Sequence, residues 1–177
     1  LLSASSCWDQ REIEEQAFIM GMGLDKGEIS DKIMVTFQIA QPQAFVAEAQ
    51  AEESFWNISE EADDIMAAGN QLARIINQIP NMEHCQVILV GEELAREGLI
   101  EHLDYLLRTH EVRRMVNIGV VQGRARDVLD MKFRTSLMPS FVLTEMMSEN
   151  SKYTYDITNF MNVGRLHMAD TMGSDFV

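Results

Sequence analysis

The amino-acid sequence predicts an α/β (α+β) domain, in which a mixed β-sheet with an N-terminal antiparallel hairpin packs against several helices. Three patterns lead to this prediction. Residues Lys32 to Ala40 alternate between apolar and polar side chains, as a half-buried strand does. Residues Cys85 to Val90 are almost continuously apolar, which indicates a strand covered on both faces. Residues Ser59 to Ile79 carry apolar side chains at helical spacing.

The composition limits the possible functions. The chain has 177 residues, enough for one domain with a sizeable core. Its formal net charge of -14 leaves no basic footprint for nucleic acid and no electrostatic attraction to anionic lipid. The two cysteines, Cys7 and Cys85, are not at the spacing of metal ligands. The sequence also lacks a run of about 18 apolar residues, the length that a membrane-spanning helix needs.

The first residues are typical of the end of a bacterial lipoprotein signal. An apolar and small-residue segment, Leu1 to Ser6, stands directly before Cys7. In such a signal the cysteine becomes the lipidated first residue of the mature protein. Ala4 and Ser6 depart from the commonest residues of this box, so a free or buried thiol at Cys7 is the alternative. We therefore assign residues 1–7 to the end of a signal, with Cys7 as the candidate lipidation site.

Two stretches near the N-terminus predict the antiparallel hairpin. The first, Ala17 to Leu24, holds Gly21 and Gly23 among large apolar residues, and the second is Lys32 to Ala40. Asp25 to Glu28 has the composition of a turn between them. The two glycines indicate close packing of the first strand against a helix, or a bulge.

The next segment predicts a loop and the longest helix of the chain. Pro42 to Glu53 has little pattern, and we expect a surface loop there, followed by a short edge strand at Phe55 and Trp56. In the helix predicted from Ser59 to Ile79, Ser59 is the expected N-cap, and a proline follows its last residue. An amphipathic helix can also bind a membrane, but the outer face of this one is acidic, which favours a core helix.

The predicted central strand leads into a short helix. Gly91 ends the strand, Glu92 and Glu93 suit the positive start of a helix, and Gly98 closes it. No Gly-x-Gly-x-x-Gly or Gly-Lys-Ser/Thr motif is present, and two carboxylates would repel a phosphate, so the pattern argues against a nucleotide site.

The remaining elements follow the same reasoning from periodicity. In chain order we expect a helix at Ile100–Arg108, a strand at Val112–Val121, and helices at Ala125–Met131, Leu137–Met147 and Ile157–Leu166. The two buried strands would be parallel, because helices connect them. The tail from Ala169 to Val177 has no pattern.

No combination of side chains in the sequence predicts an active site. His84 and Cys85 are neighbours on the predicted strand, so their side chains point to opposite faces and cannot form a nucleophile–base pair. Cys85 is expected to be a buried, unreactive thiol. The other histidines lack a second ligand at metal spacing; they are His102, His110 and His167. We therefore predict no catalytic residue, metal ligand or cofactor.

Three blocks of the sequence together resemble a known family. They are Cys7–Ile13 with Gly-x-Gly-Leu-Asp-Lys-Gly at Gly21–Gly27, then His84 with Val87–Gly98, and finally Leu103–Arg108 with Glu111–Arg113. In this order and at these separations the blocks resemble the start of the Ger(x)C lipoproteins, which are the C subunits of spore germinant receptors. The resemblance covers the chain from Cys7 to about Thr158.

The resemblance implies an exported lipoprotein on the outer face of the spore inner membrane, lipidated at Cys7. It also implies two membrane-embedded partners, the germinant receptor A and B subunits, which act with it to start germination in response to small nutrients. Neither enzymatic activity nor a cofactor is implied. Residues 8–168 would be the N-terminal domain of this C subunit, and residues 169–177 the start of a linker or following domain.

As an alternative within the same family, the domain would itself bind the small-molecule germinant. Such a role needs a pocket with convergent polar groups. The periodic apolar residues are all assigned to core faces, and no polar cluster is expected inside. We therefore expect no tight nutrient binding by this domain alone.

Overall fold

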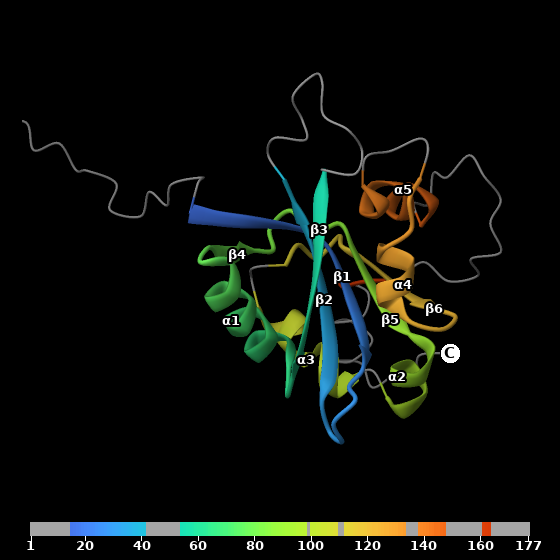
Figure 1. The fold of residues 1–177 in the computed structure, drawn as a ribbon. Coiled ribbons are helices and arrows are strands. Elements are labelled where there is room, and N and C mark those ends of the chain that lie inside the picture. The colour runs from blue at the N-terminus through green and yellow to red at the C-terminus, as the bar shows by residue number, and fades with distance from the viewer. Residues whose placement is uncertain are drawn as a thin grey trace, which may run out of the picture.

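The computed structural model describes residues 15–41, 54–98, 100–109, 112–133, 138–147 and 161–163. These residues form a seven-stranded mixed sheet with helices on both of its faces (Figure 1), as the sequence predicts. The strands are β1 (Gln16–Lys26), β2 (Ile33–Ala40), β3 (Phe55–Ala62), β4 (Ile79–Asn81), β5 (Val87–Gly91), β6 (Asn117–Val121) and β7 (Met161–Asn162). The helices are α1 (Ile65–Ile76), α2 (Glu92–Glu97), α3 (Ile100–Arg108), α4 (Ala125–Leu129) and α5 (Pro139–Met146).

The strand order is β3-β2-β1-β5-β6-β7, and β4 pairs separately with the start of β1. β1 and β2 form the predicted antiparallel hairpin, and the register shifts between Ile19 and Gly21, as expected for a bulge. β5 lies in the middle of the sheet, parallel to β1 and to β6. All five residues of β5 are buried, which confirms the prediction that both faces of this strand are covered.

The apolar side chains divide unequally between the two faces of the sheet. On one face, which we call the α1/α3 face, β1, β2 and β5 bury a large cluster that includes Phe37, Leu72, Ile88 and Leu103. The α4/α5 face buries a much smaller cluster, made of Val87, Leu89, Ala125 and Leu129. Most of the hydrophobic stabilisation therefore comes from the α1/α3 face, because that stabilisation scales with buried apolar area.

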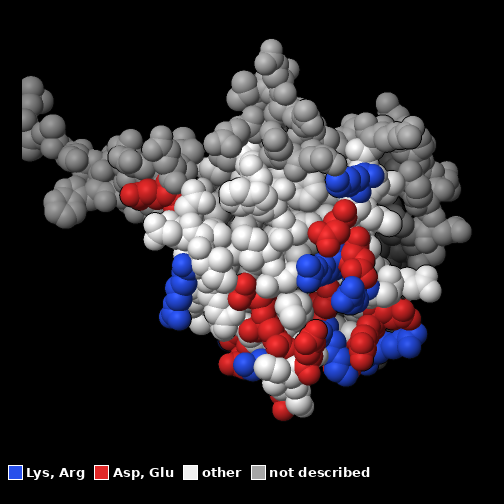
Figure 2. Space-filling model, in the orientation of Figure 1, with Lys and Arg blue, Asp and Glu red and all other residues white. Residues whose placement is uncertain are grey.

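Charged side chains are also distributed unevenly. Figure 2 shows acidic and basic side chains crowded over α2 and α4, whereas the neighbouring surface that extends upward over β3 is mostly uncharged. Within the part of the chain that the structure describes, no helix is long and apolar enough to cross a membrane.

The helix predicted from Ser59 to Ile79 is wrong at both ends. Residues up to Ala62 belong to β3, which pairs with β2 over its full length, so the edge strand predicted at Phe55 and Trp56 is longer than expected. The helix begins at Ile65, and Asp64 rather than Ser59 caps it by accepting a hydrogen bond from the Ala67 N–H at 2.7 Å. The prediction failed because polar and apolar residues in this segment fit both a strand and a helix. α1 is nevertheless the longest described helix.

Other predicted elements also differ from the structure in their boundaries or their type. The strand expected from Val112 begins only at Asn117, because the preceding residues form turns, in which the Val116 N–H donates to the Arg113 carbonyl at 3.1 Å. The helices expected at Ala125–Met131 and Leu137–Met147 are the shorter α4 and α5. Within the segment predicted as a helix at Ile157–Leu166, Met161–Asn162 forms β7, which pairs with β6.

Several predictions fall outside the described residues. They concern the signal end and Cys7 (residues 1–7), the loop at 42–53, the tail at 169–177, and the two histidines His110 and His167.

Candidate functional site

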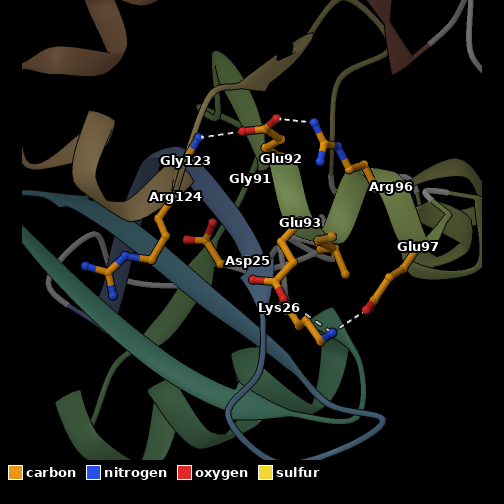
Figure 3. Close-up of a pocket in the computed structure, with 10 residues that line it drawn as sticks. Asp25, Lys26, Gly91, Glu92, Glu93, Arg96, Glu97, Gly123 and Arg124 are labelled. Atoms are coloured by element: carbon orange, nitrogen blue, oxygen red, sulfur yellow. Dashed lines mark hydrogen bonds and ion pairs between the residues drawn. The ribbon is translucent and has the colours of Figure 1, made fainter.

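An open cleft of about 420 Å³ lies at the carboxyl ends of the parallel strands β1, β5 and β6 (Figure 3). Ligands of open α/β sheets usually bind at this edge, so the cleft is the candidate site. Its charged and glycine residues come from the end of β1, the first turns of α2 and the turn before α4; they are Asp25, Lys26, Gly91, Glu92, Glu93, Arg96, Glu97, Gly123 and Arg124.

Asp25 joins β1 to the start of α4. Its carboxylate is buried and accepts hydrogen bonds from the N–H groups of Ala125, at 2.7 Å, and Arg126, at 3.0 Å. A Cβ atom on Gly91 would stand 2.1 Å from the nearer carboxylate oxygen. Glycine at position 91 therefore makes room for the carboxylate that caps α4, and both residues have a structural role.

The first turn of α2 is held to the turn before α4. The Glu92 N–H donates to the Gly123 carbonyl at 2.9 Å, and the Glu92 carboxylate accepts from Arg96 at 2.6 Å. The Gly123 N–H in turn points at the Glu92 carboxylate at 3.4 Å. Glu92, which the sequence assigned only to the start of a helix, thus also links two of the cleft's walls.

The basic side chains of the cleft are all ion-paired. Lys26 forms ion pairs with Glu97 and, at 3.4 Å, with Glu93, and these carboxylates raise the pKa of Lys26. Arg124 is paired with Asp127 at 2.9 Å. These pairs are exposed, so each contributes little to stability. A charged ligand would have to compete with them.

The chemistry available in the cleft is that of carboxylates, ammonium and guanidinium groups. Among the described residues that line it, none is a serine, threonine, cysteine or histidine that could act as a nucleophile. In the described part of the chain, no three His, Cys, Asp or Glu residues are grouped so that they could hold a metal ion.

Parts of two of the three blocks that carry the family resemblance meet at this cleft. Asp25 and Lys26 belong to the first block, Gly91 to Glu97 to the second, and Figure 3 shows them facing one another across the cleft. The reason is topological, because β1 and β5 are parallel neighbours and end at the same edge of the sheet. The two blocks thus build one structural unit.

The structure also places the other residues considered from the sequence. Cys85 is buried, and burial raises the pKa of its thiol to about 12, which agrees with an unreactive thiol. The ring of His84 packs edge-on against Phe18, with centroids 5.3 Å apart. His102 lines a second open cleft, beside α1 and α3.

The expectation that no polar cluster lies inside the domain is wrong. Gln38 is inaccessible to solvent; its amide donates to the Leu129 carbonyl at 3.1 Å and accepts from the Ser140 N–H at 3.1 Å. Asn57 donates to the same carbonyl at 2.8 Å. The alternation of β2 suggested an exposed polar face, but α4 and α5 cover it.

One signal in the sequence could have revealed this cover. Gly21 lies opposite Gln38 and Gly23 opposite Thr36 in the β1–β2 register. A Cβ atom on Gly23 would stand 3.1 Å from Leu129, which confirms the close helix packing predicted from the glycines. Polar residues on β2 that share a face with these glycines must therefore lie under a helix.

The chain resembles proteins of spore germination in comparisons with known proteins. Residues 9–171 match the family model described as the spore germination protein N-terminal domain. In Bacillus subtilis (strain 168), the chain is 27% identical to spore germination protein B3, covering 100% of this chain and 47% of that protein. It is 24% identical to spore germination protein YndF (100% and 50% covered) and 21% identical to spore germination protein A3 (99% and 47% covered).

The chain spans about half the length of these curated relatives. No solved structure matches the chain significantly.

Proposed function

Since the chain belongs to the family of spore germination protein N-terminal domains, we propose that it is the N-terminal domain of a lipoprotein subunit of a nutrient germinant receptor. The subunit is not an enzyme, is needed for germination, and acts with the membrane-embedded A and B subunits. The match of residues 9–171 carries this proposal, together with the relatives named spore germination proteins B3 and A3.

The geometry of the cleft is compatible with a role in protein contacts. Asp25, Gly91 and Glu92 fix the ends of β1 and β5 against α2 and α4 through hydrogen bonds. A binding subunit benefits from such rigid elements, because little conformational entropy is lost when a partner binds.

The subunit is held on the outer face of the spore inner membrane through lipid on Cys7, which stands just before the matched residues 9–171. One acyl chain binds a membrane only marginally, with a constant of about 10⁴ M⁻¹, so stable anchoring takes two. A diacylglyceryl cysteine supplies two chains. A domain with a net charge of -14 would be repelled by an anionic leaflet, so charge alone would not hold it there.

Fatty-acid labelling tests the anchor. The full-length protein with its complete signal is expressed with a clickable fatty acid, as wild type, Cys7→Ala and Cys85→Ala. We expect Cys7→Ala to lose the label and Cys85→Ala, the matched control for loss of a thiol, to keep it. Persistent labelling of Cys7→Ala would rule out this anchor.

Germination assays test the receptor role. Spores without the gene should fail to respond to the nutrient that their receptor recognises, and the full-length gene should restore the response. A trigger that bypasses nutrient receptors should act equally on both kinds of spore. An unimpaired response to every nutrient in the deletion strain would contradict the proposal.

The second candidate function, direct binding of the germinant by this domain, is favoured by the cleft of about 420 Å³. The pairing of its basic side chains with carboxylates argues against tight binding. Calorimetry of the full-length protein with amino acids and sugars separates the two functions. Direct binding would be favoured by a dissociation constant below about 100 μM, or about 5.5 kcal/mol, together with weaker binding by the Arg124→Ala variant.

A further inference from the structure

We propose that the outer edge of β3 binds an extended polypeptide segment as an additional strand, and that this segment carries apolar and basic side chains. β3 stands at the end of the sheet (Figure 1). All eight of its residues pair with β2 in continuous register, from Phe55 opposite Ala40 to Ala62 opposite Ile33. Within the described ranges, no strand pairs with the other side of β3.

One hydrogen bond fixes which backbone groups point outward. The Gln41 N–H donates to the Ser54 carbonyl at 3.0 Å, just before β3 begins. Backbone bonds of an antiparallel pair join directly opposite residues, and every second pair is bonded. The even-numbered residues of β3 are therefore bonded to β2. Asn57, Ser59 and Glu61 direct their N–H and C=O groups outward, where a further strand would bind.

The side chains of these same three residues are tied back to the domain. The Ser59 hydroxyl hydrogen-bonds with that of Thr36 at 2.8 Å. Asn57 donates to the Leu129 carbonyl, and Glu61 accepts from the Ile29 N–H at 2.7 Å. The edge is thus held in its strand geometry before a partner arrives, which lowers the entropic cost of binding.

In the described part of the chain, β3 has few of the features that usually protect an edge strand against pairing. Natural edge strands are commonly short, bulged, or marked by lysine or proline. β3 has the sequence Phe-Trp-Asn-Ile-Ser-Glu-Glu-Ala, without lysine or proline, and its register is unbroken. At the other end of the sheet, the described residues of β7, Met161 and Asn162, pair with Ile118 and Asn117 of β6. The two ends of the sheet are therefore not equivalent.

The side chains beside the edge indicate the chemistry of the partner. Trp56 is 55% exposed and Ile58 is half-buried, so both can pack against apolar side chains of an added strand. Carboxylates follow at the end of β3, at Glu60 and Asp63, and Figure 2 shows acidic side chains below the uncharged surface. Lysine or arginine would complement them. A second copy of this chain would instead add another charge of -14, which disfavours self-pairing.

A proline variant tests the proposal. Because the Ser59 N–H points outward, Ser59→Pro removes it without breaking a bond to β2, as an edge strand tolerates. Ser59→Ala is the matched control, since it removes only the hydroxyl contact with Thr36. The probe is a fluorescent synthetic decapeptide that alternates valine and lysine, added to the full-length protein. Thermal melts followed by circular dichroism establish that each variant is folded.

We expect the peptide to bind the wild type and Ser59→Ala alike, and Ser59→Pro at least about tenfold more weakly, or about 1.4 kcal/mol. A peptide that alternates valine and glutamate should also bind at least tenfold more weakly. Hydrogen exchange at the Ser59 and Glu61 amides should slow when the valine–lysine peptide is bound.

Equal binding to Ser59→Pro and Ser59→Ala would overturn the proposal. If Ser59→Pro does not fold, the same peptide with alternate backbone nitrogens methylated provides the test: failure to bind the wild type supports strand addition, and undiminished binding contradicts it. A concentration-dependent dimer of the wild type in ultracentrifugation, absent in Ser59→Pro, would assign the edge to a second copy and overturn the proposed partner.

Discussion

Phe37 and Gln38 are neighbours on β2 and are equally inaccessible to solvent, yet they enter opposite faces of the sheet. Phe37 joins the large apolar cluster of the α1/α3 face. Gln38 binds the end of α4 and the start of α5 through its amide group. One face is therefore stabilised mainly by apolar area, and the other by a few specific hydrogen bonds and by glycines that allow close approach.

The difference matters for the candidate site. The cleft lies where α4 begins, and the start of α4 is held by Asp25, a hydrogen-bonding residue, and not by a large apolar contact. Burial of apolar groups tolerates small displacements, whereas hydrogen bonds require defined positions. The α4/α5 face should therefore respond to polar and glycine substitutions, and the α1/α3 face to loss of volume.

The largest expected effect is on the α1/α3 face. Phe37→Ala should lower the free energy of unfolding by about 3–5 kcal/mol, because it removes a buried ring and leaves a cavity. Ile39→Val, on the same face, should cost only about 0.5–1.5 kcal/mol. Urea denaturation measures both. A loss below about 1 kcal/mol for Phe37→Ala would show that this face is not held by burial.

Gln38→Leu should lower the free energy of unfolding by about 1–3 kcal/mol, because it leaves the buried N–H of Ser140 without its acceptor. Met34→Leu serves as the control, since it changes the same face of β2 without removing a hydrogen bond. If Gln38→Leu is neutral or stabilising, apolar burial holds both faces and the contrast between them fails.

Two glycine-to-alanine variants should change the stability of the domain in opposite directions on the two faces. Gly23→Ala should destabilise the domain by about 1–2 kcal/mol, because its Cβ would stand 3.1 Å from Leu129 and 3.2 Å from Ala125. Gly69→Ala, in α1 on the other face, should stabilise by about 0.5–1 kcal/mol, since its Cβ meets Met82 at an ordinary 3.7 Å. Thermal unfolding of the two variants in one buffer shows whether the signs differ.

The smallest effect is expected at the exposed ion pairs of the cleft. Lys26→Met should change the melting temperature less than Gly23→Ala does, and the change should shrink as salt is added. Glu97 and Glu93 raise the pKa of Lys26 above its ordinary 10.5, so the contribution of Lys26 is complete below that pH and falls as the pH rises beyond it. A larger change at high salt than at low salt would contradict the exposed-pair interpretation.

The parts of the fold that the sequence predicted well have one unambiguous period. The alternation of Lys32–Ala40 and the apolar run before Gly91 identified the hairpin and the central strand, and Ile100–Arg108 was predicted with its observed ends. Ser59 was misassigned as the helix cap because the segment holds two good capping residues, Ser59 and Asp64, and the pattern alone does not choose between them. The pairing of β3 with β2 places Ser59 in a strand, so that Asp64 caps the helix.

The candidate site was less accessible to sequence reasoning. Asp25 and Gly91 lie far apart in the chain and meet only because β1 and β5 are parallel neighbours. No local pattern in the sequence predicts that these two residues meet, and Asp25 had been assigned to a turn. The family resemblance marked both blocks but gave no reason for their joint presence, which the capping of α4 supplies.

Co-purification from spores tests the central claim, that this chain belongs to a subunit of a germinant receptor. The full-length protein, tagged at its C-terminus, is extracted from spore inner membranes in mild detergent and captured, and its companions are identified by mass spectrometry. A tagged lipoprotein of the same membrane serves as the control. We predict that both membrane-embedded subunits, A and B, are recovered with this protein and not with the control. Recovery of this protein from the membrane without either subunit would contradict the account.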